Sequence, residues 1–172
     1  MPSLARPDIV FIDGRSGAGK TSFAREFAAS RGGYVLSLDE VYPGWDGLDA
    51  GSSHVYQHVV ASIDRGEAAR YRRWDWLEAR PADWVEVPRT PVLVIEGCGA
   101  IRAEAKRYSS ELYWLEAPEE LRRERTVARD GDVFSPQWVR WALQEERFLM
   151  AHGSSRRAQV IDTSESGVSN GA

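Results

Sequence analysis

A glycine-rich segment near the start of the chain has the residue types and spacing of a phosphate-binding loop. Residues 14–21 read Gly-Arg-Ser-Gly-Ala-Gly-Lys-Thr and match the pattern G-x-x-x-x-G-K-[ST] at every position. In such a loop, backbone N–H groups surround phosphate oxygens, the lysine reaches the outer phosphates, and the hydroxyl joins the shell of a Mg²⁺ ion. We therefore expect a nucleoside polyphosphate to bind here. The expected contacts are Gly14, Ser16, Gly17, Ala18, Gly19, Lys20, Thr21 and Ser22.

Carboxylates follow two apolar segments that read as strands. Asp39 and Glu40 come directly after residues 34–38, and Glu96 comes after the apolar run 92–95. Asp39 could accept the proton of an attacking hydroxyl or hold a Mg²⁺-bound water, with Glu40 as the neighbouring alternative. Its structural alternative is a cap on the following turn. Glu96 could support the metal or bind an acceptor hydroxyl. We therefore predict a metal site at Thr21, Asp39 and Glu96, and acceptor contacts at Asp39 and Glu96.

Three arginines later in the chain share one predicted helix face. Arg122, Arg125 and Arg129 are spaced i, i+3 and i+7. Guanidinium groups can stabilise the charge of a transferring phosphoryl group, so we predict that they act in catalysis together with Lys20 and Asp39. The alternative is a solvated face paired with nearby glutamates. Residues 129–132 read Arg-Asp-Gly-Asp and predict the tip of a mobile lid.

About fifty residues separate the second and third predicted strands, more than a simple crossover needs. This segment is rich in aromatic and polar side chains, which suit a small acceptor stacked by rings and fixed by hydrogen bonds. We predict acceptor contacts at Tyr42, Trp74 and Asp75. Core packing is an equal alternative for Trp74 and for its neighbour Trp76.

Alternating strand and helix patterns would position these groups. The predicted strands are residues 8–13, 34–38, 91–95, 111–115 and 158–161, and the predicted helices are residues 20–30, 53–65, 118–129 and 136–151. Such alternation is typical of a mostly parallel sheet flanked by helices. In open α/β sheets, ligands bind beyond the carboxyl ends of the strands. The phosphate loop and the carboxylates would therefore meet at one edge.

Bulk composition restricts the class of protein. The chain has 172 residues, a net charge of −4 and one cysteine, Cys98. We expect one domain at residues 1–163 with a flexible tail at residues 164–172. The charge does not favour a nucleic-acid partner, no apolar run is long enough to span a bilayer, and a single cysteine suits a reducing compartment. A cytoplasmic protein without nucleic-acid or membrane partners is therefore expected.

The motifs, taken in order, resemble the uridine kinase-like branch of the P-loop small-molecule kinases over residues 9–162. The resemblance rests on residues 13–21, 38–42, 74–76 and 95–97, and on Arg122, Arg125 and Arg129. It implies ATP and Mg²⁺, a five-stranded parallel sheet of the nucleoside-monophosphate-kinase type with a short arginine-bearing lid, and phosphoryl transfer to a small acceptor. It also implies that Asp39 is the catalytic base and that Glu96 binds metal or acceptor.

The chain departs from uridine kinases where those enzymes bind the base. A tyrosine leads the third motif in uridine kinases and a histidine lies nearby, whereas here Trp74 leads it and Ala79-Arg80 stands near the place of the histidine. A base-binding β-hairpin is not evident from the sequence. We therefore expect an acceptor other than uridine or cytidine.

Three functions remain to be distinguished. The leading one is a kinase that transfers the γ-phosphoryl group of ATP to a hydroxyl of a nucleoside or a similar polar metabolite. The second is a nucleoside monophosphate kinase, which would need an arginine clamp such as Arg70, Arg72, Arg73 and Arg80. The third is a non-enzymatic ATP-binding regulatory module.

Overall fold

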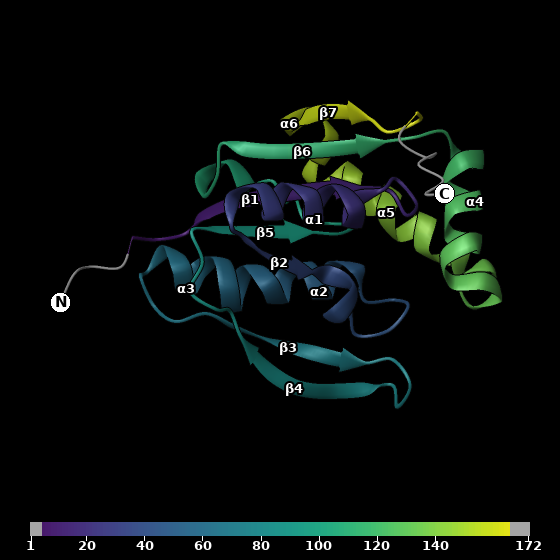
Figure 1. The fold of residues 1–172 in the computed structure, drawn as a ribbon. Helices are drawn as coiled ribbons and strands as arrows, with labels where there is room; N and C mark the ends of the chain where they lie inside the picture. Colours follow the sequence, from purple (N-terminus) through teal and green to yellow (C-terminus); the bar gives the residue numbers. More distant parts are fainter. Residues whose placement is uncertain (1–4, 166–172) are drawn as a thin grey trace, which may run out of the picture.

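A parallel five-stranded sheet forms the centre of the computed structural model, which describes residues 5–165. The strand order is β2-β5-β1-β6-β7. All four neighbouring pairs are parallel, and the strands point the same way in Figure 1. The strand bounds are β1 (Asp8–Gly14), β2 (Tyr34–Ser37), β5 (Val92–Glu96), β6 (Glu111–Glu116) and β7 (Gln159–Asp162). The predicted sheet is confirmed.

Helices cover both faces of this sheet. They are α1 (Lys20–Arg31), α2 (Leu48–Val55), α3 (Ala61–Asp64), α4 (Glu119–Asp130), α5 (Trp138–His152) and α6 (Ser154–Arg157). Short 3-10 helices lie at η1 (Leu38–Glu40), η3 (Ala105–Arg107), η4 (Gly131–Val133) and η5 (Ser135–Gln137), and one π-helical turn, η2 (Tyr56–Val60), joins α2 to α3. Helix α4 stands at the carboxyl ends of the strands (Figure 1). Within residues 5–165, no helix is both long and apolar enough to cross a membrane.

The central strand β1 shows why this chain needs two helical layers. Its successive apolar side chains alternate between two core clusters. Phe11 packs with the cluster that includes side chains of α2 and α5, whereas Ile12 packs with the cluster that includes Ala24 and Ala28 of α1. A strand buried on both faces has apolar residues in sequence instead of strict alternation. The continuous apolar run that predicted β1 therefore reflects its central position.

A second, two-stranded antiparallel sheet was missed by the sequence prediction. Strands β3 (Arg70–Asp75) and β4 (Arg80–Glu86) form a hairpin that projects below α2 and α3 in Figure 1. Tyr71 is the one side chain of β3 that is fully buried, and most positions of β4 are exposed. Mostly exposed strands rich in charged residues lack the apolar alternation on which strand prediction depends. A hairpin that was not evident from the sequence is therefore present in the structure.

Two other boundaries differ from those predicted. The helix predicted at residues 53–65 begins at Leu48 and includes the π-helical turn. The segment predicted as a lid tip, residues 129–132, ends α4 and enters η4, with Gly131 at a positive φ of 59°. Of the tail predicted at residues 164–172, all but Ser164 and Glu165 lies outside the described residues.

Candidate active site

The phosphate loop joins β1 to α1 at the carboxyl edge of the sheet. Gly17 and Gly19 have positive φ angles of 79° and 90°, a backbone conformation that residues other than glycine rarely adopt. Gly19 is the N-cap of α1, and no described side chain caps this helix. The first backbone N–H groups of a helix have no partner within it and carry the positive end of its dipole. The loop and helix therefore present donors suited to phosphate.

Lys20 lies inside this loop. Its Nζ donates a hydrogen bond to the carbonyl oxygen of Arg15 at 2.9 Å, and the side chain is buried. Burial by itself would lower the pKa of Lys20, but surrounding acidic groups, among them Glu96 and Glu145, raise it overall. Lys20 is therefore a buried, positively charged group held against the loop, where an anion could draw it away from the Arg15 carbonyl.

Glu96 brings a carboxylate to the start of α1. It ends β5, is 2% exposed, and accepts a hydrogen bond from Thr21 Oγ1 at 3.3 Å. Burial raises the pKa of Glu96, and the nearby charge of Asp39 raises it further, against hydrogen bonds from Ser37 and Thr21 and the attraction of Lys20. Of the three residues of the predicted metal site, Thr21 and Glu96 thus contact each other, and Asp39 is close enough for its charge to act on Glu96.

The donor set at this place fits a magnesium ion that uses ligands beyond the protein. A hydroxyl and carboxylates are the oxygen ligands that Mg²⁺ prefers. Among the described residues, no three histidine, cysteine or acidic side chains come together to hold a metal. Mg²⁺ is usually bound by one or two protein groups, with phosphate oxygens and water completing its shell. Thr21 and Glu96, with Asp39 nearby, would supply the protein ligands of such an ion.

Asp39 lies on η1, directly beyond β2, with its side chain exposed. Its backbone carbonyl accepts a hydrogen bond from the indole N–H of Trp76 at 2.8 Å, so the hairpin is tied to this turn. Its charge acts on Glu96 and also on Arg129. Glu40, the alternative base, instead accepts a hydrogen bond from the Tyr71 hydroxyl at 3.4 Å. Glu40 is therefore engaged with the hairpin, whereas the charge of Asp39 acts on Glu96 at the start of α1.

Two of the three predicted lid arginines hold the phosphate loop. Arg122 donates to the carbonyl oxygen of Ser16 at 3.3 Å, and Arg125 donates to that of Gly17 at 3.2 Å. The third, Arg129, forms an ion pair with Asp130 at 2.7 Å. The alternative of a solvated face is wrong for Arg122 and Arg125, because each binds a main-chain carbonyl of the loop. Helix α4 thus packs directly on the loop.

The structure does not bring Tyr42, Trp74 and Asp75, three of the predicted acceptor contacts, together at the site. Tyr42 is 1% exposed and donates its hydroxyl to the carbonyl of Cys98 at 2.7 Å, so it is a core residue and not a surface that meets an acceptor. The carboxylate of Asp75 accepts the N–H groups of Leu77 and Glu78, which caps the hairpin turn. Trp74 is half-buried on β3. None of these three side chains contacts Asp39 or the loop through a described hydrogen bond.

Two tryptophans outside the predicted acceptor contacts, Trp45 and Trp76, lie at the Asp39 turn. The ring of Trp76, whose indole binds the Asp39 carbonyl, is 5.1 Å from that of Trp45, centroid to centroid. Trp76 remains 40% exposed. Trp45 is the next aromatic residue after Tyr42 and reaches this place from the loop between η1 and α2. The chain thus presents an indole surface beside the candidate base.

Two acidic residues at the site were missed by sequence reasoning. Asp13 is buried and accepts backbone N–H groups from Gly14, Gly99 and Ile101. Burial raises the pKa of Asp13 to about 6, against the opposing effect of these hydrogen bonds. Glu145 of α5 accepts the Ser16 N–H at 2.7 Å. Glu145 could have been found from the sequence because it is a charged residue on the buried side of α5, four positions after Trp141.

Comparison with known proteins supports the fold. No family model matches the chain, and no curated protein matches it. A candidate uridine kinase from Bacillus stearothermophilus aligns with a TM-score of 0.63 at 16% identity, covering 92% of this chain and 89% of that one. A candidate fructose transport system kinase from Silicibacter sp. TM1040 aligns with a TM-score of 0.58 at 16% identity, covering 94% and 90%. The chain therefore has the fold of the P-loop kinases.

Proposed function

We propose that this protein is an ATP- and Mg²⁺-dependent kinase that transfers the γ-phosphoryl group to a hydroxyl of a nucleoside or a similar small polar metabolite. One observation carries the proposal: an uncapped helix N-terminus with a buried lysine lies beside the Thr21–Glu96 contact and the Asp39 carboxylate. A loop that only binds nucleotide has no need of acidic groups, which repel phosphate. Acidic groups are expected where a metal is held and a hydroxyl is deprotonated.

Each residue has a distinct task in this proposal. Backbone N–H groups at the start of α1 and the ammonium of Lys20 bind phosphate oxygens. Thr21 and Glu96 would hold a magnesium ion directly or through water, and the ion would supply positive charge against the phosphates. Asp39 orients the acceptor hydroxyl and accepts its proton. Arg129 is exposed and paired with Asp130, and against partial desolvation Asp130 and then Asp39 raise its pKa; in this proposal it would add positive charge at the edge of the transferring group.

The acceptor would lie between Asp39 and the pair formed by Trp45 and Trp76. Indole rings offer a large apolar surface with little conformational freedom to lose, which suits the flat face of a base or the apolar face of a sugar. This is the basis for including both nucleosides and sugars among the substrates to be tested.

The placement of Arg70 and Arg72, two of the four arginines of the predicted clamp, favours a hydroxyl acceptor over a monophosphate. Arg72 donates through Nε to the carbonyl of Ala82, and the Arg70 guanidinium stacks over the Trp84 ring at 4.8 Å. Both side chains are therefore engaged on the hairpin itself. A clamp for a second phosphate needs converging guanidinium groups, and this pair does not supply it.

A substrate panel tests the proposal. The purified protein would be incubated with MgATP and uridine, cytidine, adenosine, guanosine, fructose or the corresponding nucleoside monophosphates, and ADP release would be measured. Acceptor-stimulated ADP release with a nucleoside or sugar is expected. Faster release with a monophosphate would indicate the monophosphate kinase, and MgATP binding without any stimulated release would indicate a regulatory module.

The Asp39→Asn variant tests the assignment of the base. We expect the Kd for MgADP to stay within about threefold, because Asp39 lies on η1, outside the phosphate loop. The kcat for the best acceptor should fall by about 10²–10⁴-fold, the usual contribution of a general base. A kcat equal to that of the wild type would refute this role for Asp39.

A further inference from the structure

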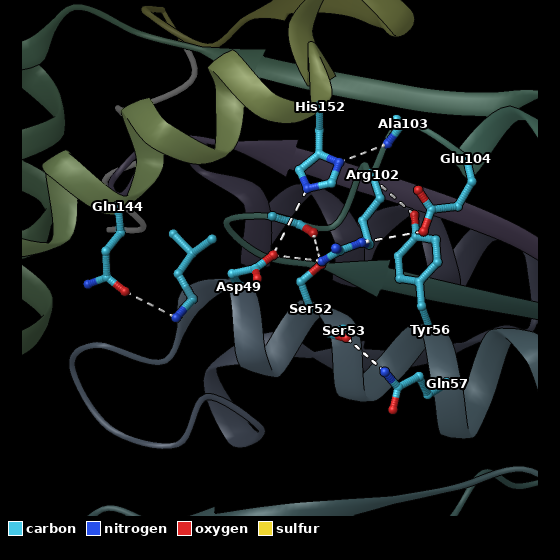
Figure 2. A network of polar contacts seen from close by, with 12 residues as sticks. Asp49, Ser52, Ser53, Tyr56, Gln57, Arg102, Ala103, Glu104, Gln144 and His152 are labelled. Atoms are coloured by element: carbon cyan, nitrogen blue, oxygen red, sulfur yellow. Dashed lines mark hydrogen bonds and ion pairs between the residues drawn. The ribbon is translucent and has the colours of Figure 1, made fainter.

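Adjacent side chains on α5 bind two different loops of the site. Gln144 accepts a hydrogen bond from the N–H of Leu48 at 3.3 Å and donates its amide N–H to the carbonyl of Trp45. Figure 2 shows Gln144 extending from α5 toward the start of α2. Its neighbour Glu145 accepts the N–H of Ser16 in the phosphate loop. A single turn of α5 therefore contacts both the nucleotide side and the acceptor side.

The surroundings of Glu145 are unusual for a carboxylate. Its side chain is 5% exposed, so its charge is removed from water. Beside the Ser16 N–H, it accepts a hydrogen bond from Cys98 Sγ at 3.4 Å and lies 3.7 Å from the guanidinium of Arg15. Burying a charge is costly unless hydrogen bonds and opposite charges compensate. Here two of the three compensating groups, at Ser16 and Arg15, belong to the phosphate loop.

The backbone of Ser16 is held from both sides. Glu145 binds the N–H of Ser16 from α5, and Arg122 binds its carbonyl oxygen from α4. A carboxylate this close to a phosphate site would by its charge alone weaken anion binding. Its hydrogen bond must therefore give a benefit that offsets the repulsion, and fixing the loop in its binding geometry is such a benefit.

The acceptor-side loop is tied to the same helix. Residues 43–47 lead from η1 to α2 and carry Trp45. Besides the two contacts of Gln144, Arg140 of α5 forms an ion pair with Asp46 in this loop. Farther along, His152 of α5 accepts the N–H of Ala103, in the network drawn in Figure 2. The place of Trp45 relative to the phosphate loop is thus set through α5.

We propose that Gln144 and Glu145 are positioning residues: Glu145 fixes the phosphate loop for the nucleotide, and Gln144 fixes the Trp45 loop for the acceptor. The inference rests on the proposed kinase function for its acceptor half. Neither side chain contacts the reacting atoms. Their effects are therefore expected on binding, each on a different ligand.

Two conservative variants separate the hydrogen bond of Glu145 from its charge. Glu145→Gln keeps an oxygen that can accept the Ser16 N–H but removes the charge, whereas Glu145→Asp keeps the charge but shortens the reach. By calorimetry with MgADP, we expect Kd within about threefold of wild type for Glu145→Gln and about 10-fold or more weaker for Glu145→Asp, since a buried donor loses its acceptor. Tighter binding in Glu145→Gln with wild-type binding in Glu145→Asp would mean that the charge merely repels phosphate, and would overturn the proposal.

Gln144→Met tests the other half, with Arg147→Gln on the exposed side of α5 as the matched control. Gln144→Met should leave the Kd for MgADP unchanged and raise the KM for the best acceptor of the panel about 5-fold or more, with the larger effect on KM than on kcat. The control should change neither. Equal losses for nucleotide and acceptor in Gln144→Met would show general disruption and refute the assignment.

Amide hydrogen exchange, measured on the protein without ligands, tests the positioning roles independently of the kinase proposal. Gln144→Met should accelerate amide exchange in residues 43–48, and Glu145→Asp should accelerate it in residues 14–18, each leaving the other segment unchanged. If the wild-type protein phosphorylates no member of the panel, the kinase proposal fails while these two results still decide the positioning roles. Unchanged exchange in both variants would refute them.

Discussion

Replacing Gly17 by alanine should damage the protein through the backbone of a neighbouring helix. Gly17 has a φ of 79°, and a Cβ atom added there would lie 2.2 Å from the carbonyl oxygen of Arg122 and 2.8 Å from its Cα. These are backbone atoms of α4, which cannot move aside by a change of rotamer. The substitution must therefore push α4 away from the phosphate loop or distort the loop itself.

The magnitude follows from three contributions. The left-handed backbone conformation costs about 1 kcal/mol for alanine. Forcing extra volume into a packed contact costs about 1–3 kcal/mol, and separating α4 from the loop weakens the hydrogen bonds that Arg122 and Arg125 donate to it, each worth about 1 kcal/mol or more. We expect Gly17→Ala to lower the free energy of unfolding by about 3–5 kcal/mol.

Gly66 provides a matched control. It has a similar φ of 74°, but an added Cβ would have no neighbour within 4 Å. Gly66→Ala should therefore show the conformational cost alone, about 1 kcal/mol. Urea unfolding at pH 7 measures both values. If the two variants lost the same stability, the close packing of α4 on the loop would be refuted.

Further outcomes concern charge, hydrogen bonding and pH. Lys20→Ala should weaken MgADP binding and reduce turnover together, as a phosphate-binding group requires, and a loss of turnover alone would contradict that role. Asp13→Asn should lower the free energy of unfolding by about 2–5 kcal/mol, because one amide oxygen cannot accept the three backbone N–H groups now shared by two carboxylate oxygens; a loss below about 1 kcal/mol would contradict this. His54 accepts the N–H of Arg72, and burial, with the charges of His58 and Arg72, lowers its pKa to about 4. Because the unfolded state then binds the proton first, with a pKa near 6.5, His54 should reduce stability as the pH falls from about 6.5 to 4. The difference in urea midpoint between wild type and His54→Gln isolates this effect from that of Asp13, which has the opposite sign, and a difference independent of pH would rule it out.

Sequence reasoning predicted the sheet well because its evidence was local. The run Val92-Leu93-Val94-Ile95 is apolar throughout, and all of β5 is buried. The phosphate loop has a pattern that depends on consecutive residues, and the carboxylates follow from the rule that ligands bind beyond the carboxyl ends of parallel strands. Asp39 and Glu96 were predicted in this way, and they lie at the carboxyl ends of β2 and β5.

The missed features depend on contacts between distant segments. Glu145 and Ser16 are far apart in sequence, and only the packing of α5 on the first loop brings them together. Tyr42 has the residue type expected of a binding site, yet its hydroxyl is satisfied by the Cys98 carbonyl inside the core. A phenol with one internal acceptor packs as well in a core as at a surface. Residue type alone could not distinguish the two.

Trp76, in the turn of the hairpin, is the residue through which the hairpin could affect the acceptor site. Its indole N–H binds the carbonyl of Asp39, so the hairpin turn and the candidate base are fixed to each other. Replacing Trp76 by phenylalanine would keep an aromatic surface but remove that hydrogen bond. If the ring mainly forms the wall of the acceptor site, the KM for the best acceptor should change little. If the bond to the Asp39 turn is what matters, kcat should fall while MgADP binding is retained, because the base would lose its fixed place opposite the phosphate loop.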